Sequence, residues 1–163
     1  MLVINCRNVN DGFVKGLDLL NEFRDDVRGS RVGQVIEATC PVATVFHSPT
    51  ERVLFEPIRR ANPFFHFMES LWMLGGRNDL DYVAKYNKRM KEYSDDGTIL
   101  HGAYGHRWRE HFGVDQLELV VHRLQLDPND RRCVVQMWDP LVDLNRAGVD
   151  VPCNISIYFK IRD

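Results

Sequence analysis

The sequence predicts an α+β fold in a single domain. Segments with the 3.6-residue period of an amphipathic helix are mixed irregularly with segments in which apolar residues recur at every second position. This order does not follow the strand–helix–strand repeat of parallel α/β folds, so we expect a mixed sheet with packed helices. The chain has 163 residues, 44% of them hydrophobic. Because that length suits one sizeable core, we expect residues 1–163 to form one domain.

The first third of the chain is expected to contain both kinds of element. Residues 2–6 resemble a short strand, and residues 10–27 an amphipathic helix with Asn10 as its N-cap. Residues 28–33 are a basic, glycine-containing turn. The β-branched stretch 34–47 predicts one or two strands.

A central helix has the clearest start in the sequence. Asn62 can cap it, and Pro63 suits the first helical position, where a missing N–H costs nothing. The helix is apolar nearly all round and ends at Gly75-Gly76, so we expect it to be buried. A polar helix is predicted over residues 78–93.

The last third alternates between helix and strand. After a turn-rich segment, Asp115 caps a helix in a capping box with Glu118. Residues 131–138 predict a strand, and residues 140–150 a loop. The final strand lies within residues 149–163, because four apolar residues share one face with period two: Ile155, Ile157, Phe159 and Ile161. The chain stops while this pattern continues, so we expect an N-terminal fragment of a longer protein.

Composition excludes some classes of function and location. The net charge of −2 gives no sign of nucleic-acid or membrane binding. The N-terminus lacks the basic start and apolar region of a signal peptide. The four cysteines show no C-x-x-C spacing, so they indicate reduced thiols in a cytoplasmic protein and no metal site.

Two residues are candidates for catalysis. Cys153 follows Pro152 where a loop enters the last strand, a frequent place for a nucleophile, although a lone cysteine is more often a small buried hydrophobe. Glu69 lies inside the apolar helix, where burial should raise its pKa, as a general acid or base requires. A structural glutamate bonded to the backbone or to a buried arginine fits Glu69 equally well.

Arginines are candidates for binding phosphate. Arg31 lies in a glycine turn, and Arg131 and Arg132 open a predicted strand, in which consecutive side chains point to opposite faces. Lone surface charges are the commoner explanation for any one of them. The segment 101–109 combines glycines, aromatic rings and bases, and Tyr104 and Trp108 there suit a flat ligand, although a packed turn explains the segment equally well.

Taken together, six motifs in this order resemble the thymidylate synthase family, which includes nucleotide hydroxymethylases. They span most of the chain, from Arg31 to Cys153. The motifs are Arg31-Val32-Gly33, Met68 to Gly76, Gly102 to Arg109, Asp127 to Arg132, Trp138-Asp139-Pro140 and Val151-Pro152-Cys153.

The resemblance implies a role for each candidate. Cys153 matches the nucleophile that adds to C6 of a pyrimidine, and Glu69 the acid/base group. Tyr104 and Trp108 match residues that line the active-site cavity. Trp72 is assigned to contact with the co-substrate, methylenetetrahydrofolate.

The arginines acquire a quaternary role from the same resemblance. Arg31 matches a phosphate clamp from the same subunit, and Arg131 and Arg132 match clamps donated across a homodimer interface. The expected substrate is therefore a pyrimidine nucleoside monophosphate bound in an active site that two subunits share.

Three features depart from the family pattern. Asn154 replaces a usual histidine, Asp139 replaces a usual asparagine, and no tryptophan lies between Asp79 and Tyr93. In synthases, tryptophans of that region cover the folate, and without them water can attack the exocyclic methylene. The sequence favours thymidylate synthase (dUMP to dTMP), with a dCMP or dUMP hydroxymethylase as the alternative and a non-catalytic nucleotide-binding relative as the second alternative.

Overall fold

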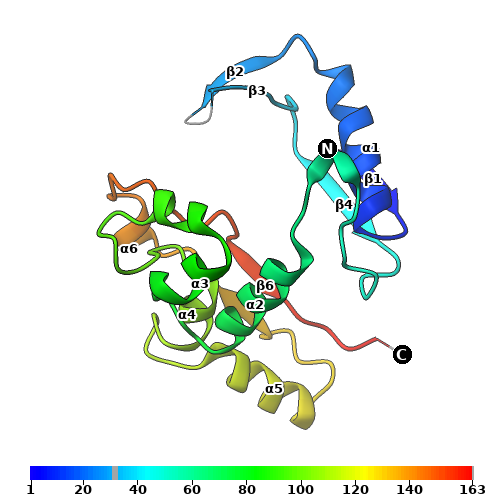
Figure 1. The fold of residues 1–163 in the computed structure, drawn as a ribbon. Coiled ribbons are helices and arrows are strands. Elements are labelled where there is room, and N and C mark those ends of the chain that lie inside the picture. Colours follow the sequence, from blue (N-terminus) through cyan, green and yellow to red (C-terminus); the bar gives the residue numbers. More distant parts are fainter. Residues whose placement is uncertain (31–32, 163) are drawn as a thin grey trace. The chain divides into compact units, whose positions relative to one another are not determined.

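The computed structural model describes residues 1–30 and 33–162, and it confirms the α+β fold (Figure 1). The chain divides into two compact units, Met1–Pro63 and Phe64–Asp163. Strands of the described part pair in three small sheets: parallel β1–β4, antiparallel β2–β3 and antiparallel β5–β6. The expectation of one domain stays a prediction.

The first unit is built on the parallel pair β1 (Leu2–Cys6) and β4 (Val42–Phe46), in which Leu2 lies opposite Val42. Helix α1 (Val9–Glu22) packs against this pair. Gly12 allows the close approach, because a Cβ there would lie 2.8 Å from the Phe46 ring. The bounds of β1 confirm the strand predicted over residues 2–6.

The predicted cap and end of the first helix are wrong. Asn8 caps α1, with its side chain accepting hydrogen bonds from the N–H groups of Asn10 and Asp11. The Asn10 side chain instead bonds the backbone of Val53 and Phe55. The helix stops at Glu22. Residues 28–30 and 33 of the expected turn belong to the antiparallel strands β2 (Val27–Ser30) and β3 (Gly33–Ile36), and residues 31–32 lie outside the described part of the chain. A 3-10 turn, η1 (Pro57–Arg59), follows β4.

The central helix α2 (Pro63–Leu74) belongs to the second unit from Phe64 onward, and its predicted start at Pro63 is confirmed. The prediction that this helix is completely buried is wrong. Phe65 and Trp72 are buried in the core, but one apolar stripe stays exposed, made of Phe64, Phe67, Leu71 and Leu74. Side chains of the second unit therefore cover only one side of the helix.

Later elements are shorter than predicted or were missed. The polar stretch 78–93 breaks into α3 (Leu80–Tyr86), capped by Asp79, and the 3-10 helix η2 (Lys88–Tyr93), capped by Asn87. The turn-rich segment contains α4 (Tyr104–Arg109). Helix α5 (Gln116–Leu126) has the predicted Asp115 cap, which accepts from the Glu118 N–H.

The last sheet contains only three residues per strand. Strand β5 (Val134–Gln136) pairs with β6 (Ser156–Tyr158), so that Val135 lies opposite Ile157. The predicted loop 140–150 begins with a short helix, α6 (Pro140–Asp143). Of the four alternating apolar residues, Ile157 and Phe159 pack against the core, whereas Ile155 and Ile161 are exposed.

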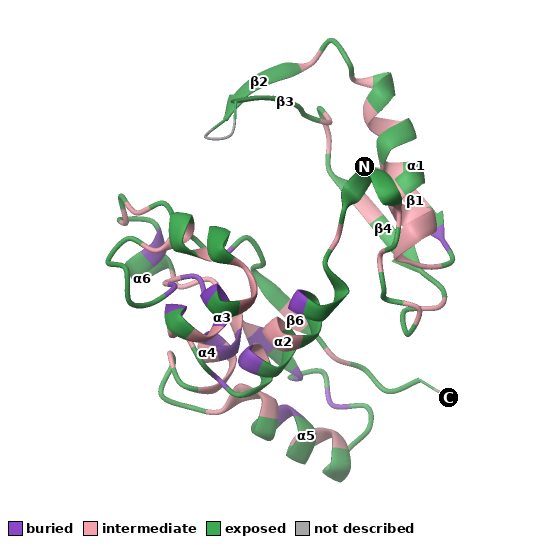
Figure 2. Cartoon of the chain, viewed as in Figure 1, coloured by how far each residue is buried: buried purple, intermediate pink, exposed green. Residues whose placement is uncertain are grey.

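Buried residues concentrate in the second unit (Figure 2). One cluster joins α2 and α3, and a smaller cluster, made of Val120, Cys133 and Val135, joins α5 to β5. Among the described residues of the first unit, only Cys6 is buried.

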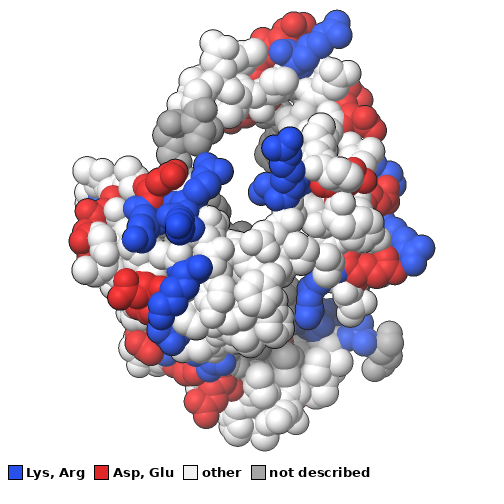
Figure 3. Space-filling model, in the orientation of Figure 1, with Lys and Arg blue, Asp and Glu red and all other residues white. Residues whose placement is uncertain are grey.

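The surface carries mixed charge. On the face in Figure 3, basic and acidic side chains are interspersed, consistent with the net charge of −2. Within residues 1–30 and 33–162, no helix has the length and apolar character needed to cross a membrane.

Candidate active site

Cys153 lies exposed just before β6. Its backbone N–H donates a hydrogen bond of 3.2 Å to the hydroxyl of Tyr104, the first residue of α4. Burial raises the pKa of that phenol, so Tyr104 remains neutral at physiological pH. Pro152, immediately before the cysteine, is buried. The backbone around Cys153 is therefore anchored while its thiol faces solvent.

Glu69 lies on α2 and is partly buried. Burial raises the pKa of its carboxyl, and the nearby His66 imidazole lowers it by a smaller amount. Among the described residues, none donates a hydrogen bond to this carboxylate in the structure. A carboxyl whose proton affinity is raised, and which no neighbour holds, suits proton transfer.

Helices α2 and α4 touch through their backbones. A Cβ on Gly105 would lie 2.0 Å from the carbonyl oxygen of Met73, so only glycine permits this approach. Met73 is one helical turn beyond Glu69, and Gly105 follows Tyr104. The contact therefore fixes the helix that carries Glu69 against the helix that anchors Cys153.

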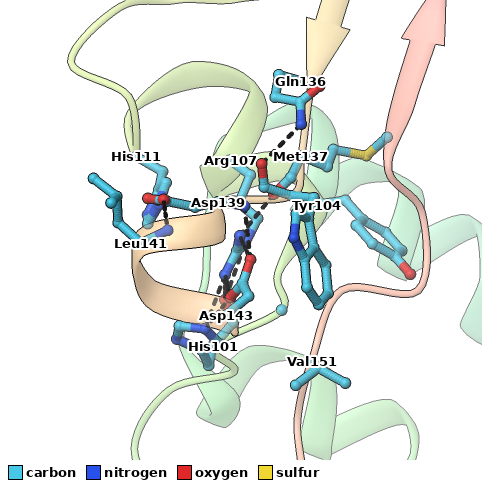
Figure 4. A network of polar contacts seen from close by, with 12 residues as sticks. His101, Tyr104, Arg107, His111, Gln136, Met137, Asp139, Leu141, Asp143 and Val151 are labelled. Carbon is cyan, nitrogen blue, oxygen red and sulfur yellow. Dashed lines mark hydrogen bonds and ion pairs between the residues drawn. The ribbon is translucent and has the colours of Figure 1, made fainter. Parts of the chain in front are cut away.

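A buried ion pair between Arg107 and Asp143 joins α4 to the short helix α6 (Figure 4). The guanidinium of Arg107 is fully buried and donates to both carboxylate oxygens of Asp143, at 2.7 and 2.9 Å. It also donates to the Met137 carbonyl at 2.6 Å, and the His101 imidazole lies 2.7 Å from Asp143. Arg107 is therefore occupied structurally and is unavailable to phosphate.

Opposing effects act on the Asp143 carboxyl. Burial alone would raise its pKa. Hydrogen bonds from Arg107, from the Asp139 N–H and from His101 outweigh burial, and the net result is a pKa lowered from 3.8 to about 2. The carboxylate is thus ionised at neutral pH and balances the buried guanidinium.

Asp139, which departs from the family pattern, also has a structural task. Its side chain caps α6 by accepting from the Leu141 N–H, and it lies 2.9 Å from the His111 imidazole. That contact is the main reason why the pKa of Asp139 is lowered.

The candidate phosphate ligands have different surroundings. Arg31 lies outside the described residues. Arg131 and Arg132 are exposed and lie in a turn before β5, so their predicted place in the strand is wrong. The Arg132 guanidinium donates to both carboxylate oxygens of Asp130, at 2.9 and 2.8 Å, and this pairing strongly lowers the pKa of Asp130.

The two tryptophans that are site candidates, Trp72 and Trp108, have different surroundings. Trp72 is 3% exposed in the core, and its indole N–H donates to the Asp79 carbonyl, so it offers little surface to a ligand. The indole nitrogen of Trp108 is buried and has no hydrogen-bond partner within the described part of the chain. Contact of Trp72 with folate stays a prediction.

Several residues of this site were missed at the sequence level. Asp143 pairs with Arg107 across 36 residues of sequence, and no local pattern marks such a pair. The short helix that carries Asp143 did have a signal, since Asp139-Pro140 repeats the cap-then-proline pattern that identified the start of α2. In the described chain, no group of three or more His, Cys, Asp or Glu side chains is arranged to hold a metal ion.

Comparison with known proteins identifies the family. A family model described as thymidylate synthase matches residues 58–163. The chain is 52% identical, over 99% of its length, to a deoxyuridylate hydroxymethyltransferase of Pseudomonas phage M6, and 37% identical, over 83%, to one of Bacillus phage SP01. It is 28% identical, over 98%, to a putative thymidylate synthase of Methanothermobacter thermautotrophicus, 68% of which it covers.

A solved structure agrees with these sequence matches. The thymidylate synthase of T4 phage superposes with a TM-score of 0.50 and 25% identity, over 61% of this chain and 40% of that one. The chain spans 46% and 37% of the lengths of the two phage hydroxymethyltransferases. With two thirds of its residues matched by the family model and its motifs in the family's order, the chain belongs to the thymidylate synthase family.

Proposed function

We propose that the protein transfers a one-carbon unit to C5 of a pyrimidine deoxynucleotide, with Cys153 as the nucleophile. The observation that carries this proposal is the exposed Cys153 thiol on a backbone that the Tyr104 hydroxyl anchors. Addition of the thiolate to C6 of the pyrimidine makes C5 electron-rich, so that C5 attacks an electrophilic carbon. Loss of the C5 proton and departure of the folate amine leave an exocyclic methylene at C5. Addition of water or of a hydride from the folate to this methylene then expels the Cys153 thiolate and releases the product.

Glu69 is the proposed acid/base group. Protons must move at the pyrimidine carbonyl when Cys153 adds and leaves, and burial raises the pKa of the Glu69 carboxyl, which lets it hold a proton at higher pH than a free carboxyl. The absence of a donor to Glu69 among the described residues favours this role over that of a structural glutamate.

Methylenetetrahydrofolate is the proposed one-carbon co-substrate, and it supplies the electrophilic methylene group. The cavity-lining roles proposed for Tyr104 and Trp108 suit its flat ring.

The nucleotide phosphate is proposed to bind Arg31, Arg131 and Arg132. The exposed guanidinium of Arg131 can reach outward, which suits donation to a second subunit of a homodimer. Arg132 retains an exposed side chain despite its pair with Asp130. A cytoplasmic location fits a nucleotide substrate and four free cysteines.

Hydroxymethylation is one possible end of the reaction, and methylation is the other. The 52% identity to a deoxyuridylate hydroxymethyltransferase favours hydroxymethylation of dUMP. The lack of tryptophan between Asp79 and Tyr93 agrees, because water then has access to the exocyclic methylene. The similarity to putative thymidylate synthases supports methylation, in which the folate is oxidised.

One assay separates these possibilities. The intact protein is incubated with methylenetetrahydrofolate and either dUMP or dCMP tritiated at C5, and tritium release and dihydrofolate are both measured. Tritium release with dihydrofolate identifies a synthase, and release without dihydrofolate identifies a hydroxymethylase. Release from neither nucleotide would contradict the proposal and favour a nucleotide-binding relative. Cys153→Ala is the matched control and should release no tritium.

A further inference from the structure

The segment that leads to Cys153 is fastened by a carboxylate from outside it. The Asp95 carboxylate accepts a hydrogen bond of 2.8 Å from the Val149 N–H and forms an ion pair with Arg146. The Val149 hydrogen bond is the largest reason why the pKa of Asp95 is lowered. Residues 146–149 are therefore held to the turn that follows η2, about four residues before the nucleophile.

Asp150 makes a second attachment, in which a carboxylate of the segment itself accepts from backbone outside it. Its carboxylate accepts a hydrogen bond of 2.8 Å from the N–H of Gly102. The backbones are in tight contact here. A Cβ on Gly102 would lie 3.0 Å from Asp150 Oδ1 and 3.1 Å from the backbone nitrogen of Pro152.

The same turn also holds the segment at Cys153. Tyr104, two residues after Gly102, accepts the Cys153 N–H. Gly102 and Tyr104 thus bind Asp150 and Cys153, which are three residues apart and have the buried Pro152 between them. Two attachment points at the start of α4 determine both the position and the direction of the intervening backbone.

We propose that Asp150 is a positioning residue, whose bond to the Gly102 N–H sets where the Cys153 thiol lies relative to C6 of the nucleotide. This inference rests on the proposed function. Because Asp150 acts through the backbone of Cys153, its loss leaves nucleotide binding intact and displaces the nucleophile. Displacement of a reacting group by about 1 Å can cost about 10²-fold in rate.

The test compares Asp150→Ala with Asp150→Asn in the intact protein. Asp150→Ala removes the acceptor and should lower kcat for C5 tritium release by about 10- to 100-fold, with the nucleotide KM within about threefold of wild type. Asparagine keeps a side-chain oxygen that can accept from Gly102, so Asp150→Asn should restore most of kcat. A purely structural role would produce neither this split of kcat from KM nor the rescue.

Amide hydrogen exchange supplies a readout that does not need turnover. Asp150→Ala should speed exchange in a peptide that covers residues 149–154, because the Cys153 N–H loses its fixed partner geometry. Asp18→Ala, which removes an exposed carboxylate on α1, is the matched control and should change neither exchange nor kcat.

Each result bears on one proposal. Wild-type kcat in Asp150→Ala, or equal losses in the alanine and asparagine variants, overturns the positioning role. If Asp150→Ala does not fold, Gly102→Ala replaces it, because its Cβ pushes on Asp150 and Pro152 by a few tenths of an ångström. A lowered kcat with unchanged KM in Gly102→Ala supports the role, and wild-type kcat overturns it. Absence of tritium release from the wild-type protein instead contradicts the proposed function.

Discussion

Burial affects the two proposed catalytic side chains in different ways. Glu69 is partly withdrawn from water, so the pKa of its carboxyl is raised and its protonated form is favoured. Cys153 is exposed, so a nucleotide can reach its thiol without rearrangement of the core. The surroundings of the Glu69 carboxyl therefore suit proton transfer, and those of the Cys153 thiol suit nucleophilic attack.

Replacing Glu69 by glutamine should reveal the cost of its burial. The folded-state pKa lies above the ordinary value of 4.5, so ionisation opposes folding once the pH rises past 4.5 and through the raised pKa. Glu69→Gln should therefore have a higher Tm than wild type at pH 7, and the difference should vanish below about pH 4. Its kcat should fall while nucleotide binding persists. A Tm that drops at neutral pH would indicate a structural glutamate.

The ion pair of Arg107 with Asp143 should respond to pH in the opposite direction. The Asp143 pKa falls from 3.8 to about 2, so its stabilisation is complete above pH 3.8 and is lost as the pH falls through about 2. Asp143→Asn leaves the buried guanidinium without a counter-charge and should destabilise the protein by about 3–5 kcal/mol at pH 7. Unfolding in urea at pH 7 and pH 3 measures both effects. Equal stability at pH 7 would contradict this account.

Among the elements, the contact between α2 and α4 organises the site. Glu69 belongs to α2, and Tyr104, which anchors Cys153, begins α4. Their spacing depends on the missing side chain of Gly105, which brings the second helix against the Met73 carbonyl. Side chains on two separate helices are thus placed by one backbone contact.

Gly105→Ala should therefore disturb both stability and catalysis. Its Cβ would lie 2.0 Å from Met73 O, so the helices must separate, and we expect a loss of more than about 2 kcal/mol. Gly16→Ala is the matched control, because apart from the backbone of α1 itself no atom of the described residues lies within 4 Å of the Cβ that it adds. That change should stabilise by about 0.5–1 kcal/mol. Thermal unfolding of both variants measures the difference, and equal effects would contradict the role of Gly105.

The whole molecule distributes its core unevenly. The second unit contains two buried clusters and every described candidate of the site, whereas in the described first unit only Cys6 is buried. The exposed stripe of α2 and the exposed side chain of Arg131 are both accessible for contact with another protein surface. The proposed homodimer provides one such surface for the arginine.

Mixing two inactive variants tests whether subunits share a site. Arg131→Ala and Cys153→Ala are unfolded together, refolded and assayed for C5 tritium release. If Arg131 serves the partner's site, hybrid dimers contain one intact site, and about a quarter of wild-type activity should return. Cys153→Ala mixed with Glu69→Gln is the control. Both residues are proposed to act in the active site of their own subunit, so no hybrid dimer contains an intact site and activity should stay low. No gain in the first mixture would contradict a shared site.

Sequence alone was sufficient wherever the cause is local. Pro63 marked the start of α2, and Asp115 with Glu118 marked α5, because these residues act on backbone groups within one turn. The motif order likewise led to the family, and with it to Cys153 and Glu69. Local signals failed where competing caps stood close together, as with Asn8 and Asn10.

Tertiary structure decided the features that join distant parts of the chain. The burial of Arg107 against Asp143, the attachment of Asp150 to Gly102 and the anchoring of Cys153 by Tyr104 link residues 36, 48 and 49 positions apart. An arginine, an aspartate or a glycine carries no mark of such a partner in its neighbours. Whether each becomes a ligand-binding group or a support depends on which surface the fold covers, and that is determined only when the elements pack.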